Sequence, residues 1–217
     1  MGPEVREIIL SKIKHQENPL YGLKWRPTLE PAISDDVDAW NLPQDCPPEF
    51  TVFDHTILKM LIKRIKKPRC IVEIGVDNSP LGFEHSSTNT ILKTKPKKCI
   101  YLGIDILDRS HTHNVNNNVY TLKCSSGSHQ LIKDKLADLK VSTIDFLFID
   151  GWHSVNQVIE EWKYWDVMSP KSIMAFHDTN FHPGPLAVLD AVDETLFTVE
   201  RFGVDLLDWG MACVTRK

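Results

Sequence analysis

The sequence predicts an α/β protein with a doubly wound, mostly parallel sheet and helices on both faces. After Pro68, short apolar and β-branched runs alternate with segments of helical or polar pattern. Strands separated by helical stretches form parallel β-α-β units, whose helices cover both faces of the sheet. Residues 203–208, which separate the last two runs, are too few for a crossover helix. These last two strands should therefore be antiparallel neighbours.

Seven strands follow from these runs, and two helices follow from apolar residues at helical spacing. The expected strands are residues 70–75, 100–105, 119–123, 144–150, 172–177, 196–202 and 209–215. One helix is expected over residues 56–65, with a basic outer face and C-terminal end. The other begins at Ser154, which forms a Ser-x-x-Gln capping box with Gln157. The expected whole is a seven-stranded Rossmann-like sheet that ends in an antiparallel hairpin.

The first part of the chain differs from the rest. Residues 1–67 start with a short amphipathic stretch and continue through a run rich in proline. Trp25, Trp40 and Phe50 are interleaved with these prolines, so the segment should pack on the main body. We expect residues 1–67 to form a helical and irregular cap on a domain of residues 68–217.

Composition narrows the class of protein. With 25 Lys and Arg against 29 Asp and Glu, the net charge is −4, which gives no overall attraction to nucleic acid or to an anionic membrane. Five scattered cysteines without a Cys-x-x-Cys pair favour a reducing compartment. The longest apolar runs, such as residues 146–149, are too short to span a bilayer. We expect a soluble cytoplasmic protein whose partners are small molecules, and self-association stays open.

Acidic residues stand at the ends of four expected strands. Glu73 comes two residues before Gly75, and Asp105, Asp150 and Asp178 follow or end later strands. In open parallel sheets, ligands bind beyond the carboxyl ends of the strands. The sequence therefore predicts a functional site at this edge.

The first two strand ends suit a nucleoside with a positive charge. Gly75 allows a tight turn, Glu73 can accept from an amine or hydroxyl, and Asp105 can accept from both hydroxyls of a ribose. The Gly-x-Gly-x-x-Gly signature of dinucleotide sites is absent after Gly75. Asp77 in that loop would repel a phosphate but attract a cation. S-adenosylmethionine, which has a sulfonium, an ammonium and a ribose, fits this pattern.

The exit of the third strand carries small hydroxyls. Ser125 and Ser126 could hold the edge of an adenine. A Ser/Gly turn that caps the next helix explains the same residues equally well. Both interpretations stay open at this point.

The fourth and fifth strand ends suggest a metal ion and a base. Asp150 ends one strand, His153 lies just outside the next helix, and the pair His177 and Asp178 ends the neighbouring strand. Neighbouring strands would bring Asp150 and Asp178 within reach of a common ion. Oxygen ligands favour Mg²⁺, and a histidine widens the choice toward Mn²⁺ or Fe²⁺. In the alternative, Asp150 caps a helix or pairs locally, and His177 is a packed strand residue without a ligand. This alternative is weaker because three polar groups converge at one edge of the sheet.

Four motifs resemble one enzyme family. They are residues 72–75 (Val-Glu-Ile-Gly), 102–105 (Leu-Gly-Ile-Asp), 148–153 (Phe-Ile-Asp-Gly-Trp-His) and 176–179 (Phe-His-Asp-Thr). From Pro68 onward the chain resembles the class I S-adenosylmethionine-dependent methyltransferases. It is most similar to the metal-dependent O-methyltransferases of small molecules and macrolide sugars, and to the group labelled cephalosporin hydroxylases.

The resemblance implies a methyl transfer to a small-molecule or sugar hydroxyl. Glu73 and Gly75 would hold the methionine part of the cofactor, and Asp105 the ribose.

In the same way, the resemblance implies that Asp150 ligates a divalent metal, with Mg²⁺ expected, and that His153 acts as the catalytic base. His177 and Asp178 would complete the metal site. His177 stands where the sugar-methylating enzymes have a carboxylate.

Two other functions compete with this one. A non-catalytic nucleoside-binding domain would keep the fold without a working metal site. A nucleic-acid methyltransferase could use the basic residues 59–69 and 93–98, although residues 151–153 (Gly-Trp-His) replace the motif of amine-methylating enzymes.

Further aromatic and histidine residues have weaker predicted roles. Trp25, Trp40, Trp152 and residues 179–186 are expected to shape the acceptor pocket. The pairs His111/His113 and His177/His182 could suggest zinc, but they lack cysteine partners at ligand spacing and are interpreted as loop histidines.

Overall fold

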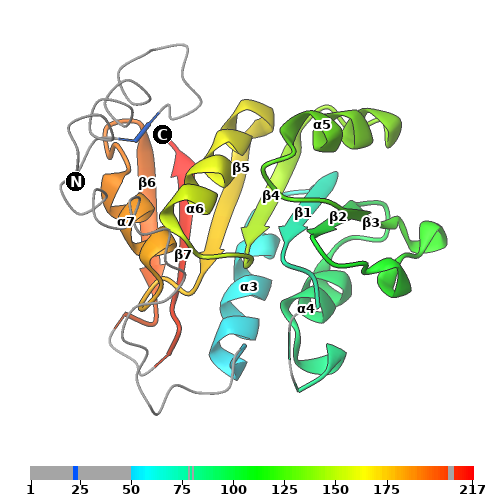
Figure 1. Cartoon of the computed structure of the whole chain (residues 1–217), viewed down its shortest axis with the longest axis horizontal. Coiled ribbons are helices and arrows are strands. Elements are labelled where there is room, and N and C mark those ends of the chain that lie inside the picture. Colours follow the sequence, from blue (N-terminus) through cyan, green and yellow to red (C-terminus); the bar gives the residue numbers. More distant parts are fainter. Residues whose placement is uncertain (1–21, 24–49, 78, 80, 205–207) are drawn as a thin grey trace.

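The fold is a seven-stranded sheet between two layers of helices. The computed structural model describes residues 22–23, 50–77, 79, 81–204 and 208–217. The strand order is β3-β2-β1-β4-β5-β7-β6, with β7 antiparallel to both of its neighbours and the other strand pairs parallel (Figure 1). The strands are β1 (Cys70–Ile74), β2 (Ile100–Asp105), β3 (Val119–Lys123), β4 (Ile144–Ile149), β5 (Met168–His177), β6 (Phe197–Phe202) and β7 (Met211–Arg216). The predicted fold class is confirmed.

The helices divide between the two faces. On one face lie α3 (Val52–Arg64) and α4 (Ser87–Thr94), which pack against each other. On the other face lie α5 (His129–Asp138), α6 (Val155–Trp162) and α7 (Pro183–Ala191). Short 3-10 turns are Phe83–His85, Ser110–Thr112, Val115–Asn117 and Lys163–Val167.

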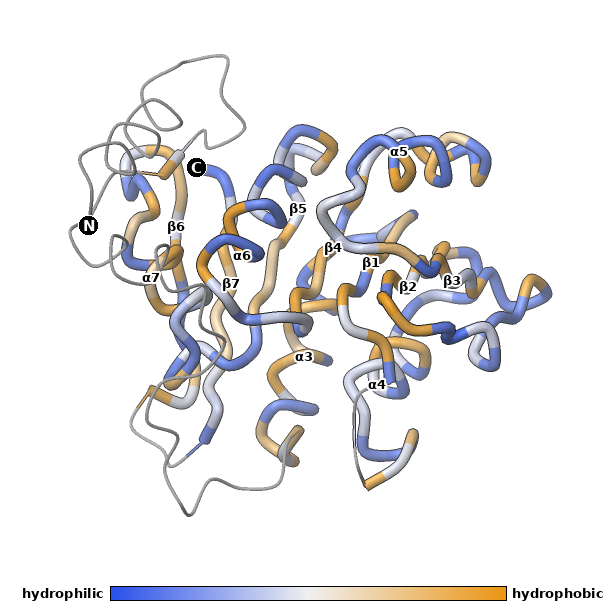
Figure 2. The backbone as a smooth tube through the Cα atoms, viewed as in Figure 1, coloured by the Kyte–Doolittle hydropathy of each residue, from blue (hydrophilic) through white to orange (hydrophobic). Residues whose placement is uncertain are grey.

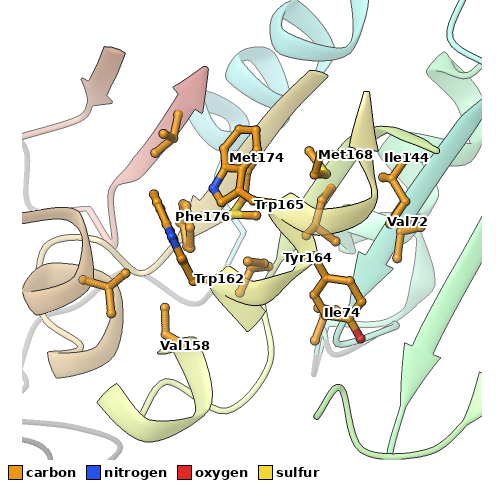
Figure 3. Packing of buried hydrophobic residues seen from close by; sticks show 14 of the residues in the cluster. Val72, Ile74, Ile144, Val158, Trp162, Tyr164, Trp165, Met168, Met174 and Phe176 are labelled. Atoms are coloured by element: carbon orange, nitrogen blue, oxygen red, sulfur yellow. The ribbon is translucent and has the colours of Figure 1, made fainter. Parts of the chain in front are cut away.

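Successive side chains of the central strands point to opposite faces of the sheet, so the molecule has one core on each face. In β1, Ile71 faces the core under α3 and α4, whereas Val72 faces the core under α5, α6 and α7. In Figure 2, hydrophobic stretches recur along the central strands, whereas much of α5 is hydrophilic. Figure 3 shows the second core, where Trp162 stacks on Phe176 with ring centroids 6.5 Å apart. A sheet buried on both faces explains why these strands read as continuous apolar runs.

Some predicted boundaries shift. The fifth strand begins at Met168 instead of residue 172, and the seventh begins at Met211 instead of residue 209. The helix expected over residues 56–65 begins earlier, because Thr51 caps it and exchanges hydrogen bonds with Asp54. The last two strands pair in antiparallel register, as expected, and β7 inserts between β5 and β6.

The N-terminal cap is described only in part. Trp25 and Trp40 lie outside the described residues. Leu23 forms a β-bridge with Val192, and α3, which belongs to the expected cap, buries Leu58 and Leu61 in the core. The division at residue 67 stays a prediction. Among the described residues, no helix combines the length and the apolar character needed to cross a membrane.

Candidate active site

Two adjoining cavities lie at the carboxyl edge of the sheet. The β1–β3 cavity, of about 250 Å³, is lined by residues at the ends of β1, β2 and β3. The β4–β5 cavity, of about 220 Å³, is lined by residues at the ends of β4 and β5. Gly151 lines both. The edge that the sequence singled out therefore has two cavities that meet at one residue.

Asp105 is held in place at the wall of the β1–β3 cavity. Its Oδ2 accepts from the Val76 N–H and from Arg109 Nε, both at 3.0 Å. Its Oδ1 accepts from the Leu107 N–H at 2.8 Å. Gly75, which also lines this cavity, makes the turn after β1 at φ +84°. The structure brings these two predicted cofactor residues together, with the carboxylate oriented before any ligand binds.

Ser125 and Ser126 both line the β1–β3 cavity, but their hydroxyls have different partners. Ser125 Oγ accepts from the Gly127 N–H at 3.2 Å, as in the turn interpretation. Ser126 Oγ donates to Glu161 Oε1 at 2.7 Å and accepts from Gln157 Nε2 at 2.6 Å. The turn interpretation therefore holds for Ser125, whereas a contact of either serine with an adenine stays a prediction.

Glu161 and Gln157 form a polar network that the sequence did not reveal. Ser154 Oγ accepts from the Gln157 N–H at 3.3 Å, so the expected helix cap is present. The Gln157 side chain, however, donates to Ser126 and to Glu161 Oε1 at 3.3 Å, instead of completing a capping box. Gln157 also lines the β1–β3 cavity. Burial raises the pKa of Glu161 to about 8.

Glu73 lies behind the cavities, in the core below α4. Its oxygens accept from Ser87 Oγ at 2.6 Å, from Thr88 Oγ1 at 2.8 Å and from the Tyr101 hydroxyl. Burial raises the pKa of Glu73 to about 8. Ser87 itself lines the β4–β5 cavity, with Oγ 3.5 Å from Asp150 Oδ2. Glu73 thus positions the first turn of α4, and its predicted contact with the cofactor stays a prediction.

Asp77, like Glu73, is not among the residues that line the two cavities. Its Oδ2 lies 2.9 Å from His111 Nε2, and its N–H donates to Thr88 Oγ1 at 2.8 Å. Its φ of +52° is unusual for a residue other than glycine. The pairing with His111 also gives that histidine a structural role.

The β4–β5 cavity contains the predicted metal ligands. His177 Nδ1 lies 3.2 Å from Asp150 Oδ1 and 3.2 Å from Asp178 Oδ2. Ligand atoms of these three residues all lie within 4.8 Å of one another. They meet because β4 and β5 are adjacent and parallel. Two carboxylates and an imidazole at this spacing fit a divalent cation.

Asp54 of α3 supports His177 from behind. Its Oδ2 lies 3.5 Å from His177 Nε2, and its side chain is fully buried. At this distance His177 Nε2 makes no hydrogen bond to Asp54, so the contact acts through charge. No sequence signal pointed to Asp54, because it belongs to the N-terminal cap. Metal-ligating histidines commonly have a carboxylate on the side away from the metal, so the position of Asp54 also fits a metal site.

Charges within the cluster shift its pKa values strongly. Burial alone would lower the pKa of His177, but Asp178 and Asp150 outweigh it and raise that pKa well above the usual value. Burial alone would raise the pKa of Asp178, but His177 and His153 hold it well below the usual range. His153 Nε2 lies 3.0 Å from Asp178 Oδ2 and 3.9 Å from Asp150 Oδ1. Asp178 therefore connects the two histidines.

His182, interpreted from the sequence as a loop histidine, is also a cavity residue. It is 8% exposed, stands at the N-cap of α7 and lines the β4–β5 cavity. Its ring centroid lies 4.6 Å from that of His153. The sequence hints were its place within residues 179–186, expected to shape the acceptor pocket, and its position directly before Pro183, a residue favoured in the first turn of a helix.

Aromatic residues line both cavities. Phe50 and Trp209 line the β4–β5 cavity, whereas Trp152 lines the β1–β3 cavity and is 56% exposed. Of residues 179–186, His182 lines the β4–β5 cavity, and their contact with an acceptor stays a prediction.

Comparison with known proteins adds to this geometry. No family model matches. The curated protein y4gI of Sinorhizobium fredii, described as uncharacterized, is 26% identical over 117 residues, which are 51% of this chain and 12% of that protein. MycE from the mycinamycin biosynthetic pathway, solved with Mg, S-adenosylhomocysteine and mycinamycin VI, superposes with a TM-score of 0.56 at 16% identity. That match covers 88% of this chain and 55% of MycE, so the chain spans about half of MycE and a smaller share of y4gI.

Two shorter methyltransferases align over most of their own length. The Bacillus cereus O-methyltransferase, solved with S-adenosylhomocysteine, has a TM-score of 0.54 at 16% identity, over 89% of this chain and 92% of that one. The N-methyltransferase NodS of Bradyrhizobium japonicum has a TM-score of 0.50 at 11% identity, over 87% and 97%. With this strand order and these neighbours, the chain has the fold of the class I S-adenosylmethionine-dependent methyltransferases.

Proposed function

We propose that this chain is an S-adenosylmethionine-dependent methyltransferase that methylates a hydroxyl of a small molecule with the help of a divalent metal. One observation carries the proposal: a cavity with a fixed carboxylate adjoins a cavity with a His–Asp cluster, and the two meet at Gly151. The neighbours solved with S-adenosylhomocysteine, and MycE with Mg, support the same pair of ligands.

The β1–β3 cavity would hold the cofactor. Asp105 would accept hydrogen bonds from the ribose hydroxyls, and the turn at Gly75 leaves room for the methionine part. The acceptor Oε1 of Gln157 matches the amino group of an adenine. Ser126, whose hydroxyl is fixed by Glu161 and Gln157, would hold the edge of the adenine in position.

The β4–β5 cavity would hold the acceptor. Asp150, His177 and Asp178 would hold the metal, which supplies Lewis-acid activation of the acceptor hydroxyl when bound. His153 would take the hydroxyl proton, and it lies beside the cluster with Nε2 3.0 Å from Asp178 Oδ2. The shared wall at Gly151 would align the hydroxyl with the methyl group for in-line transfer.

Calorimetric titration tests the cofactor assignment first. We expect S-adenosylmethionine and S-adenosylhomocysteine to bind, with a response to acceptors that disappears in chelator. Asp105→Asn should weaken cofactor binding by at least about tenfold, because one or two charged hydrogen bonds are lost. Absence of binding by either ligand would contradict the cofactor assignment.

Variants of the His–Asp cluster test the roles in transfer. His153→Ala and Asp150→Ala should each lower turnover of a hydroxyl acceptor, by about 100-fold or more for loss of a general base. Cofactor affinity should stay close to that of the unaltered protein, because neither residue is assigned to cofactor binding. Equal loss of affinity and turnover would show that these residues belong to the cofactor site instead.

The basic residues considered for nucleic acid lie elsewhere. Lys63, Lys67, Arg69, Lys97 and Lys98 line a groove of about 610 Å³ beside the amino ends of β1 and β2. This is the opposite edge of the sheet from both cavities. A nucleic acid bound there would not present its bases to the His–Asp cluster, so the geometry favours a small acceptor.

A further inference from the structure

The His–Asp cluster contains two sets of three ligand residues that share Asp178. The first set is Asp150, His177 and Asp178, and the second is His153, Asp178 and His182. In each set the ligand atoms lie within 4.8 Å of one another. We propose that the second set forms a separate metal position, which takes Zn²⁺ or a similar ion that prefers imidazole ligands.

The second set is compact and buried. His153 and His182 are each 8% exposed, and Asp178 is 7% exposed. His153 Nε2 lies 3.0 Å from Asp178 Oδ2, and the two histidine rings are 4.6 Å apart between centroids. The His182 ring also packs against Trp209, with ring centroids 5.5 Å apart. These contacts hold both rings close to the shared carboxylate.

The backbone fixes this arrangement from two directions. The Gly184 N–H donates to the His153 carbonyl at 2.8 Å, so the first turn of α7 lies directly on the residue before Ser154. A Cβ at Gly184 would lie 2.4 Å from that carbonyl oxygen, so a glycine is required for the approach. The His182 N–H donates to the Asp178 carbonyl at 3.3 Å. His182 is thus tied to both other members of the set.

The two sets differ in the ions that they favour. The first has two carboxylates and one imidazole, and the second has two imidazoles and one carboxylate. Carboxylates suit Mg²⁺ and Mn²⁺, whereas imidazole suits Zn²⁺, Ni²⁺, Cu²⁺ and Fe²⁺. Catalytic zinc sites also typically have three protein ligands and one open position, whereas structural zinc sites have four protein ligands. The second position therefore discriminates against Mg²⁺.

Occupancy of the second position has a consequence for the proposed function, although the site itself does not depend on methyl transfer. An ion held by His153 Nε2 occupies the lone pair that would take the proton of the acceptor hydroxyl. Zn²⁺ would then inhibit the Mg²⁺-supported reaction.

Binding of Co²⁺, a spectroscopic substitute for Zn²⁺, tests the second position without any cofactor or acceptor. The variants are Asp150→Asn, which damages only the first set, and His182→Gln, which damages only the second. His85→Gln is the matched control, because His85 is exposed and belongs to neither set. Thermal melting checks that each variant is folded.

In Asp150→Asn we expect a visible Co²⁺ band that Zn²⁺ abolishes by displacement. His182→Gln should lose this band and bind Zn²⁺ at least about 100-fold more weakly. Loss of a residue that only supports a ligand already lowers metal affinity by about 10–100-fold, and His182 would be a direct ligand. His85→Gln should match the unaltered protein. If His182→Gln does not fold, His153→Gln removes another ligand of the same set and should give the same loss.

Two results would overturn the proposal. One is Zn²⁺ affinity in the folded His182→Gln variant within about threefold of the unaltered protein. The other is loss of the Co²⁺ band in Asp150→Asn, which would mean that all the ligands serve a single ion. Because neither measurement involves methyl transfer, failure here and failure of the proposed function are distinguishable.

Discussion

At the scale of single residues, buried carboxyl groups organise the cavity walls from behind. Glu73 accepts from Ser87 at the β4–β5 cavity, and Glu161 accepts from Ser126 at the β1–β3 cavity. Burial raises the pKa of both carboxyl groups to about 8. Their protonation is therefore linked to folding, because an unfolded chain would release these protons near pH 4.5.

The Glu161→Gln variant tests this linkage. Because the pKa is higher in the folded state, the stabilisation from Glu161 is complete below about pH 4.5 and is lost as the pH rises toward 8. The loss is on the order of 4 kcal/mol. Between pH 5 and pH 8 the unaltered protein should lose this stabilisation, whereas Glu161→Gln should not. The variant should therefore become more stable relative to the unaltered protein as the pH rises.

Urea denaturation at several pH values measures this difference. Glu160→Gln, on the same helix but partly exposed and paired with Lys163, is the control and should show a nearly constant difference. The idea fails if Glu161→Gln and Glu160→Gln have parallel pH profiles.

At the scale of elements, the start of α6 determines where His153 lies. Ser154 is the N-cap of α6, and its Oγ accepts from the Gln157 N–H. The same short segment receives the first turn of α7 through the Gly184 N–H. One turn thus connects β4, α6 and α7 around a single histidine.

Ser154→Ala should lower the free energy of unfolding by about 1 kcal/mol, because the helix loses its capping hydrogen bond. Ser128→Ala is a matched control, since Ser128 is the N-cap of α5 but makes no side-chain capping bond there. Its effect should stay within about 0.5 kcal/mol. Equal effects of the two substitutions, measured by urea denaturation, would refute the specific role of the Ser154 cap.

At the scale of the whole molecule, strand order places the cavities. The order runs β3-β2-β1 on one side and β4-β5 on the other, so the direction of chain progression reverses between β1 and β4. Crevices form at the carboxyl ends of strands where this reversal occurs. The two cavities adjoin at Gly151, which follows β4 and lies against the end of β1, where a Cβ on Gly151 would be 3.1 Å from Ile74 Cγ2.

Cofactor binding should therefore stabilise the entire fold. At a concentration 100 times its dissociation constant, a ligand adds about 2.7 kcal/mol. For a chain of this size, S-adenosylhomocysteine should then raise the melting temperature by roughly 5–10 °C. In Asp105→Asn the same ligand concentration should give a smaller rise. A rise that is unchanged in this variant would place the ligand outside the β1–β3 cavity.

Local pattern determined most of the fold and part of the site. Apolar runs and turn residues fixed the strands, because burial on both faces of a sheet leaves a continuous apolar signature. The rule that consecutive parallel strands lie side by side was enough to bring Asp150 and Asp178 together. The cap at Ser154 was equally local.

Only the tertiary structure decided the contacts between distant segments. It placed β7 between β5 and β6, Asp54 behind His177, and His182 against His153. It also paired Asp77 with His111 and turned Gln157 toward Ser126. Sequence periodicity reports which residues are buried, whereas such pairings depend on how helices from opposite layers pack at the edge of the sheet. No local pattern carries that information.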